Sequence, residues 1–238
     1  MLYNNGEMKS SVVLFSGGLD STTALYWAKK KRGEVLALTF DYGQRHRVEI
    51  GMARRTARKA GVPWALLKVD LTQIGGSALT DPAIAVPKSR RFAHSADGPP
   101  VTYVPFRNGI LLALAAAWAE ARGADEVITG FNVIDSPDYP DTRPDFVRAM
   151  ARAVNAGTRA AYTGRGFRIT APFIRLKKSD IVKIVLELGA DYSLSVSCYD
   201  CGEIPCGRCS SCLLRRRAFR EAGVPDPLLV RLRKGGHP

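Results

Sequence analysis

Cysteine is missing from most of this 238-residue chain: all five cysteines lie between positions 198 and 212. An odd, local cluster suits metal or redox chemistry better than a disulfide framework. Long hydrophobic runs are missing as well, since the longest, residues 110–119, covers about half of the roughly 20 residues that span a bilayer. The sequence therefore predicts no transmembrane helix.

Acidic residues are scarce relative to basic ones, with 22 Asp plus Glu against 35 Lys plus Arg and a formal net charge of +13. Such a surplus favours anionic partners, but it does not separate a nucleic acid from a nucleotide or an acidic metabolite. Residues 1–11 carry no apolar segment followed by a cleavage site, so we expect a cytoplasmic protein. Hydrophobic residues at 46% and charged residues at 24% exclude wholesale disorder and a coiled coil.

Strand-like and helix-like segments alternate along the chain. Short apolar runs predict strands at 11–15, 35–40, 64–69, 126–130 and 167–173, and longer periodic segments predict helices at 22–31, 48–59, 109–121, 145–155, 178–188 and 211–221. This alternation predicts an α/β fold with a parallel sheet covered by helices on both faces. Residues 71–100 show no such period and are typical of a functional lid or a disordered loop, with order returning at 101–104.

A glycine turn, residues 16–21 (SGGLDS), joins the first predicted strand to the first predicted helix. It offers backbone N–H groups at the positive end of a helix, with no side chain to block a phosphate, and Ser16 and Ser21 add hydroxyl donors. Asp20 would repel a phosphate unless a divalent cation bridged the two, and Mg²⁺ prefers such oxygen ligands. An ordinary turn with a capping Ser or Asp is the alternative for this segment taken alone.

Taken whole, the hexapeptide resembles the PP-loop of the ATP pyrophosphatase group, which holds the β,γ-pyrophosphate of ATP. It has neither the G-K-[ST] ending of a Walker A loop nor a GxGxxG fingerprint. The resemblance implies adenylation, in which a substrate oxygen attacks the α-phosphate and releases pyrophosphate. Positioning and charge neutralisation would supply most of the catalysis.

The cysteine cluster has the spacing of a zinc site. Two-residue spacers separate Cys206, Cys209 and Cys212, and such spacers let a tight turn aim two sulfurs at one ion. Tetrahedral zinc needs four ligands, and spacing alone allows either Cys198 with these three or a set in which Cys201 replaces Cys206. A redox pair or buried thiols is the alternative, but the surrounding glycines and polar residues suit a zinc knuckle better than a core.

Seven blocks follow one another along nearly the whole chain: FSGGLDSTT (15–23), TFDYGQRH (39–46), GSALTD (76–81), TYVPFRN (102–108), ITGFN (128–132), YPDTRPDF (139–146) and SCYDCGEIPCGRCSSC (197–212). Together they resemble the 7-cyano-7-deazaguanine (preQ0) synthase family of queuosine biosynthesis. The resemblance implies ATP-dependent conversion of 7-carboxy-7-deazaguanine and ammonia to the nitrile. The carboxylate would be activated, converted to an amide by ammonia, activated again and dehydrated.

The same resemblance implies a Rossmann-like fold of the adenine nucleotide alpha hydrolase type, a homodimer, one structural zinc per chain, and ATP with Mg²⁺ as co-substrate. We accordingly expect a nucleotide-binding α/β domain over residues 1–190 and a small zinc-binding helical subdomain over residues 191–238. By position, the family's zinc ligands fall on Cys198, Cys206, Cys209 and Cys212. Cys201 stands where the family has a small residue that is not a ligand, and Thr142 replaces the cysteine of a YPDCR block.

Position in the family also assigns the ATP site, with the backbone of residues 38–40 available to the adenine edge. Its residues would be Phe15, Ser16, Gly17, Gly18, Leu19, Asp20, Ser21, Thr22 and Thr23. For the substrate, carboxylates suit the N–H donors of a deazaguanine edge, and a cation suits its 7-carboxylate. The candidates are Asp135, Asp138 and Asp141 for the first role, Arg107, Arg143 and Lys177 for the second, with Asn108 and Tyr139 beside them.

Asp20 and Arg107 are the candidate catalytic residues of this set. The alternative for each acidic residue is simple turn formation. His46 follows a strand end, where sites gather in open α/β sheets, and a surface or capping role is its alternative.

An RNA-modifying PP-loop enzyme, such as a tRNA thiolase or lysidine synthetase, is the second hypothesis, because a basic chain with a zinc knuckle can grip a phosphate backbone. Against it, the length leaves no room for an additional RNA-binding domain, and four zinc ligands leave a single thiol, too few for a sulfur relay. An inactive nucleotide-binding scaffold is the third, and the intact SGGLDS argues against it. We expect small-molecule partners rather than nucleic acid or membrane, and a solvated or dimer-facing surface at residues 215–217.

Overall fold

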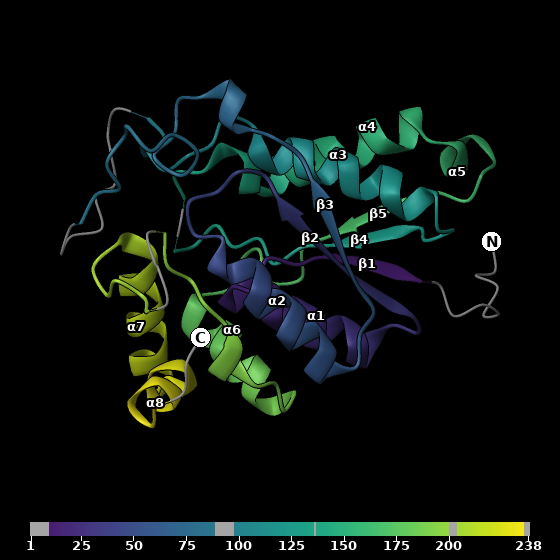
Figure 1. Cartoon of the computed structure of the whole chain (residues 1–238). Helices are drawn as coiled ribbons and strands as arrows, with labels where there is room; N and C mark the ends of the chain where they lie inside the picture. Colours follow the sequence, from purple (N-terminus) through teal and green to yellow (C-terminus); the bar gives the residue numbers. More distant parts are fainter. Residues whose placement is uncertain (1–9, 89–97, 136, 200–203, 236–238) are drawn as a thin grey trace.

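The computed structural model describes residues 10–88, 98–135, 137–199 and 204–235, and their strands form one parallel sheet (Figure 1). The strands are β1 (Ser11–Leu14), β2 (Val35–Asp41), β3 (Trp64–Lys68), β4 (Glu126–Ile128) and β5 (Arg168–Thr170), in the order β3-β2-β1-β4-β5. All neighbouring strands run parallel, and β1 lies at the centre, with Val13 in register with Ala37 of β2 and Ile128 of β4. The predicted α/β fold class is confirmed.

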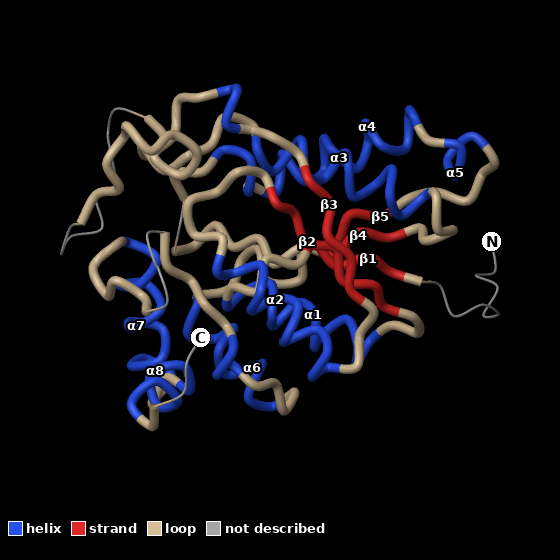
Figure 2. The backbone as a smooth tube through the Cα atoms, viewed as in Figure 1, coloured by secondary structure: helices blue, strands red, loops and turns tan. Residues whose placement is uncertain are grey.

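Helices cover both faces of this sheet (Figure 2). They are α1 (Leu19–Lys31), α2 (Val48–Ala60), α3 (Arg107–Glu120), α4 (Pro144–Gly157), α5 (Arg159–Tyr162), α6 (Lys178–Glu187), α7 (Ser210–Ala222) and α8 (Pro227–Arg233), with 3-10 turns η1 (Thr72–Ile74), η2 (Pro140–Thr142) and η3 (Tyr192–Leu194). Helices α1, α2 and α6 lie on one face, and α3 and α4 lie on the other. The described helices include none that is long and apolar enough to cross a membrane.

The side-chain alternation of β1 divides the core between the two faces. Val13 is buried among α1, α2 and α6, whereas its neighbour Val12 is buried with Leu112 and Ala116 of α3. Successive strand residues point to opposite faces, and each fully buried aliphatic side chain contributes about 1.5–3 kcal/mol. This two-sided core explains why Val12, Val13 and Leu14 of β1 are all aliphatic, while the buried hydroxyl of Ser11 donates to Glu126 Oε2 at 2.8 Å.

Most predicted elements are present with shifted ends, and two helices were not predicted. Helix α5 is a single turn, and α8 begins with a capping signal that the sequence contains: the side chain of Asp226 accepts from the Leu228 amide, and Pro227 occupies the first helical position. Residues 101–104, where we expected order to return, form no regular element: 101 and 102 lie in a turn and 103 and 104 in irregular chain. The segment 71–100 carries only η1 within its described part.

The C-terminal helices pack against the layer of α6, as Figure 1 shows for α7 and α8. Their principal anchor is Arg215 of α7, which is 6% exposed and donates two hydrogen bonds, of 2.6 and 2.8 Å, to the carboxylate of Asp226. The expectation that residues 215–217 form a solvated or dimer-facing surface is therefore wrong for Arg215. Arg216 and Arg217, on the other side of the helix, are exposed.

Candidate active site

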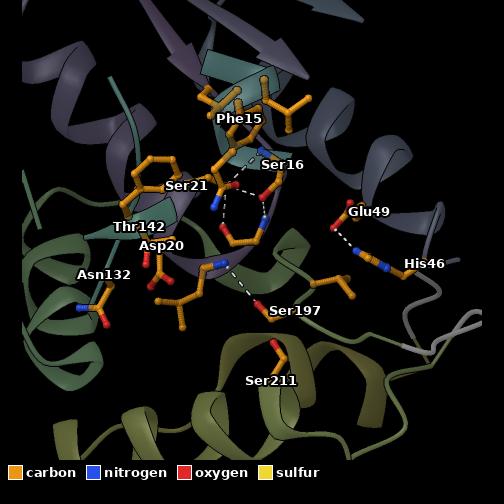
Figure 3. A pocket seen from close by; sticks show the side chains of 18 of the residues that line it. Phe15, Ser16, Asp20, Ser21, His46, Glu49, Asn132, Thr142, Ser197 and Ser211 are labelled. Atoms are coloured by element: carbon orange, nitrogen blue, oxygen red, sulfur yellow. Dashed lines mark hydrogen bonds and ion pairs between the residues drawn. The ribbon is translucent and has the colours of Figure 1, made fainter. Parts of the chain in front are cut away.

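A cavity of about 290 Å³ lies at the carboxyl ends of β1, β2 and β4. The chain leaves β1 towards β2 by way of α1 and reaches β4, on the other side of β1, by way of α3. Open α/β sheets bind ligands in the crevice at such a switch in strand order. The cavity wall combines the turn after β1, the start of α3, and a segment from the C-terminal part of the chain. Figure 3 labels Ser16 and Ser21 of the turn and Ser197 of the C-terminal segment.

The turn between β1 and α1 is stabilised by hydrogen bonds of its own hydroxyl groups. The Oγ atoms of Ser16 and Ser21 lie 3.1 Å apart, Ser21 Oγ accepts from the Ser16 amide at 3.3 Å, and Ser16 Oγ accepts from the Gly18 amide at 3.3 Å. Gly17 has a φ of 79°, and a Cβ there would lie 3.0 Å from the backbone nitrogen of Ala53 in α2. The turn therefore needs glycine for its conformation and for its close approach to α2.

Six residues of the predicted ATP set line the cavity: Phe15, Ser16, Gly18, Leu19, Asp20 and Ser21. Leu38 and Phe40 of β2, whose backbone was expected near the adenine, line it as well. Thr22 and Thr23 are completely buried, and Thr23 bonds the carbonyl of Leu19 and the hydroxyl of Tyr192. Neither threonine lines the cavity, and of the two only Thr23 bonds the start of the helix through its side chain.

Lys178, which sequence reasoning missed in favour of Lys177, lines the cavity at the first position of α6. Its Nζ atom donates to Asp20 Oδ2 at 2.5 Å, and its backbone amide donates to Asp135 Oδ2 at 2.6 Å. The other oxygen of Asp20, Oδ1, is buried and has no hydrogen-bond partner among the described residues. An orphaned carboxylate oxygen beside a phosphate-type turn has the donor chemistry that a divalent cation needs.

Arg107 lines another part of the wall, at the first position of α3. It donates to the Tyr42 hydroxyl at 3.1 Å, and its Nε and Nη2 donate to Asn108 Oδ1 at 3.3 and 3.2 Å. Burial lowers the pKa of Arg107, but the interactions with Tyr42 and Asp141 raise the pKa by more than burial lowers it. The net shift is upward, and the guanidinium stays charged. Burial also raises the pKa of Tyr42, which keeps its phenol neutral. This wall offers a fixed cation to an anionic group.

The predicted substrate residues divide into those that line the cavity and those that do not. Arg107, Asn108 and Tyr139 line it. Asp141 is buried behind them, where its Oδ2 accepts from the Asn108 amide at 3.0 Å and caps α3. Asp135 does not line the cavity either, and its carboxylate accepts from the amide of Lys178. Neither Asp138 nor Arg143 lines the cavity; Arg143 is exposed and donates to the carbonyl of Pro137 at 3.3 Å. A direct role in substrate binding stays a prediction for all of them.

His46 is buried in the cavity wall rather than exposed. Its Nε2 lies 3.1 Å from Glu49 Oε2, and Glu49 Oε1 accepts from Gln44 Nε2 at 3.1 Å. The ring of Tyr199 lies 6.3 Å away in a tilted arrangement, and burial raises the pKa of Tyr199 well above its usual value. Glu49 was not singled out from the sequence, although it lies three residues after His46 in the first turn of α2.

The four cysteines of the family-based assignment come together in the structure. The Sγ atoms of Cys198, Cys206, Cys209 and Cys212 all lie within 4.8 Å of one another. Sγ of Cys198 and Sγ of Cys206 accept backbone N–H groups at 3.3 and 3.4 Å, as sulfur ligands of metals do. Hydrogen bonding with its thiol neighbours raises the pKa of Cys212, so four thiolates at this spacing require a cation. The cluster can hold a metal ion; Cys201 lies outside the described residues.

Comparisons with known proteins place the chain in a family. The family model described as "Queuosine biosynthesis protein QueC" matches residues 10–223. A curated protein named 7-cyano-7-deazaguanine synthase from Anaeromyxobacter sp. (strain Fw109-5) is 51% identical over 223 residues, which cover 93% of this chain and 96% of the relative. One of the same name from Azotobacter vinelandii (strain DJ / ATCC BAA-1303) is 50% identical over 222 residues, with 92% and 97% covered.

Among solved structures, a 4-thiouridine synthetase in complex with RNA and bound ATP matches with a TM-score of 0.50. The match has 19% sequence identity and covers 94% of this chain and 53% of that chain. At this identity the likeness shows the fold alone.

Proposed function

The chain belongs to the family of queuosine biosynthesis protein QueC, and on that premise we propose that it makes 7-cyano-7-deazaguanine from 7-carboxy-7-deazaguanine, ammonia and ATP. The observation that carries the proposal is the single cavity lined by both the turn at residues 16–21 and the Arg107–Asn108 wall. One part suits a triphosphate, and the other suits a carboxylate on a polar heterocycle. Adenylation needs these two anions side by side.

Each activation follows from this arrangement. A carboxylate oxygen of the substrate attacks the α-phosphorus of ATP, and the bond to pyrophosphate breaks. Ammonia then displaces AMP and loses a proton, which leaves the amide. The amide oxygen attacks a second ATP in the same way, and departure of AMP with loss of the N–H protons leaves the nitrile. One pyrophosphate is released for each activation, so two accompany each nitrile.

The chain's own residues act by position and charge. Lys178 and the N–H groups at the start of α1 would hold the pyrophosphate, and Arg107 would orient the carboxylate towards the α-phosphorus. Mg²⁺, when bound, would neutralise phosphate charge, and Asp20 Oδ1 is the oxygen free to hold it. Leu14, Leu38 and Phe40 offer an apolar surface to the adenine ring.

The remaining proposals concern the metal and the assembly. Four crowded thiols with N–H donors fit one zinc per chain, held by Cys198, Cys206, Cys209 and Cys212. We propose a cytoplasmic homodimer on the family resemblance, with residues 1–190 as the nucleotide-binding domain and residues 191–238 as the zinc-binding segment.

The test mixes the metal-loaded protein with 7-carboxy-7-deazaguanine, ammonium, ATP and Mg²⁺ and measures the nitrile by mass spectrometry and pyrophosphate by a coupled assay. We expect the nitrile, an ATP- and ammonia-dependent amide at early times, and a pyrophosphate-to-nitrile ratio near two. Absence of the nitrile under these conditions contradicts the proposal. A parallel reaction with unmodified tRNA in place of the base distinguishes the RNA-modifying alternative.

A further inference from the structure

A short segment, residues 195–198, links the cysteine cluster to the phosphate-binding turn. At one end, Ser195 is completely buried and its Oγ accepts from Arg215 Nη1 at 3.2 Å, while Arg215 is held by Asp226. At the other end, Cys198 belongs to the cysteine cluster. Two long-range anchors therefore fix a segment that has no regular secondary structure of its own.

Between these anchors the segment contacts the turn twice. The amide of Val196 donates to the carbonyl of Gly17 at 3.3 Å, and Ser197 Oγ accepts from the amide of Leu19 at 3.3 Å. Leu19 is the first residue of α1, so its N–H has no acceptor within the helix. Figure 3 shows this bond at the base of the cavity, where both Val196 and Ser197 lie in the wall.

We propose that Ser197 is a positioning residue for ATP: by accepting the Leu19 N–H it fixes the start of α1, so that the remaining free N–H groups of the first helical turn face the phosphates. A hydroxyl that accepts one hydrogen bond keeps its own hydrogen for another acceptor, so Ser197 can bridge the helix start and a phosphate oxygen. Because Cys198 follows directly, the cysteine cluster restricts where this hydroxyl can lie. The inference rests on the proposed function only in taking the turn as the ATP site.

The experiment compares Ser197→Ala and Ser197→Thr with wild type by equilibrium binding of ATP and by the steady-state KM and kcat. Ser193→Ala is the matched control, since Ser193 Oγ donates to Asp191 and does not line the cavity. We expect ATP affinity to fall about ten-fold in Ser197→Ala, as for a hydrogen bond to a charged group, and to return within about three-fold in Ser197→Thr. Metal content and melting temperature should stay at wild-type values in both variants.

Two results would overturn the inference. The first is unchanged ATP affinity in Ser197→Ala; the second is a loss of affinity accompanied by an equal loss in Ser193→Ala or by loss of the metal, which marks a general structural effect. ATP binding needs no nitrile product, so the failure of the proposed function is recognised separately. Wild type that binds ATP but forms no nitrile ends the functional proposal and leaves the test of Ser197 intact.

Discussion

Two walls of the same cavity are built in opposite ways. The turn at residues 16–21 is local: its hydroxyls bond backbone and side chains within the same six residues, between a strand and the helix that follows it. The segment at residues 195–198 is assembled at long range, by Arg215, Asp226 and the cysteine cluster, and it reaches the turn from far along the chain. In the proposed function the local wall carries the chemistry, and the assembled wall holds it in position.

This difference separates effects on catalysis from effects on stability. A change in a polar side chain of the local wall should reduce turnover while leaving the fold intact, because the packing of this turn against its neighbours is made mainly by its backbone. A change in the anchors of the assembled wall should reduce both stability and ATP affinity. The variants below test this division, from the largest expected effect to the smallest.

Asp20→Ala should abolish ATP-dependent turnover, with a loss of at least about a hundred- to a thousand-fold in kcat, because the proposed cation site and the partner of Lys178 are both removed. Pyrophosphate release measures the rate, and the melting temperature checks the fold. Asp180→Ala is the control for loss of a carboxylate from α6: its side chain is 47% exposed and pairs only loosely with Lys183, at 3.9 Å, so turnover should be unchanged and the melting temperature should change little. Turnover within ten-fold of wild type in Asp20→Ala would remove Asp20 from the mechanism.

Arg215→Ala should lower the free energy of unfolding by about 3–5 kcal/mol, because it leaves the buried carboxylate of Asp226 without its partner. The neighbouring Arg216→Ala, at an exposed position, should change it by less than about 0.5 kcal/mol. Urea unfolding of both variants measures the difference. Equal stabilities would mean that Arg215 does not anchor the assembled wall.

Cys206→Ser should lose the metal, whereas Cys201→Ser should retain about one ion per chain. Cys206 belongs to the clustered set, and the other set that the spacing allows would give the reverse pattern. Metal analysis of the purified variants by mass spectrometry distinguishes the two. If only Cys201→Ser loses the metal, then Cys201, and not Cys206, is the fourth ligand.

Gly130→Ala should destabilise the protein by about 1–3 kcal/mol and weaken ATP binding, since a Cβ there would lie 2.7 Å from the backbone carbon of Asp20. Gly109→Ala meets only the ring of Phe106, which is 53% exposed and can move aside, so its cost should be smaller. Thermal unfolding of both variants shows which substitution destabilises the protein more. A larger effect at Gly109 would contradict this account of the close approach between β4 and α1.

Contiguous motifs made one half of the site predictable from the sequence. The turn at 16–21, the pair Arg107–Asn108 and the spaced cysteines are each read within a few neighbouring residues, and the structure brings all three to one region. The strand–helix alternation likewise predicted the parallel sheet, because burial on both faces leaves β1 without a polar period.

The residues that were missed act across the fold. Lys178 reaches Asp20 only because α6 packs beside α1, and Ser197 reaches Leu19 only through the two anchors of its segment. Arg215 belongs to a run of three arginines that is typical of a basic surface. The helical period, however, places Arg215 alone of the three on the buried face of α7. The burial of Arg215 can thus be inferred from the helical period, whereas no local pattern distinguishes Lys178 or Ser197 from ordinary polar residues.

The most direct test of the link between the two walls uses the unmodified protein. The rate at which a coloured chelator removes the metal is measured with and without saturating ATP. If the cysteine segment and the phosphate-binding turn position each other, bound ATP must stabilise the metal-loaded state, and release should slow several-fold. Because free ATP also binds released metal, the chelator is chosen to bind the ion far more tightly than ATP does and is used in large excess, so that competition from ATP does not lower the colour signal. An unchanged or faster release would contradict the account.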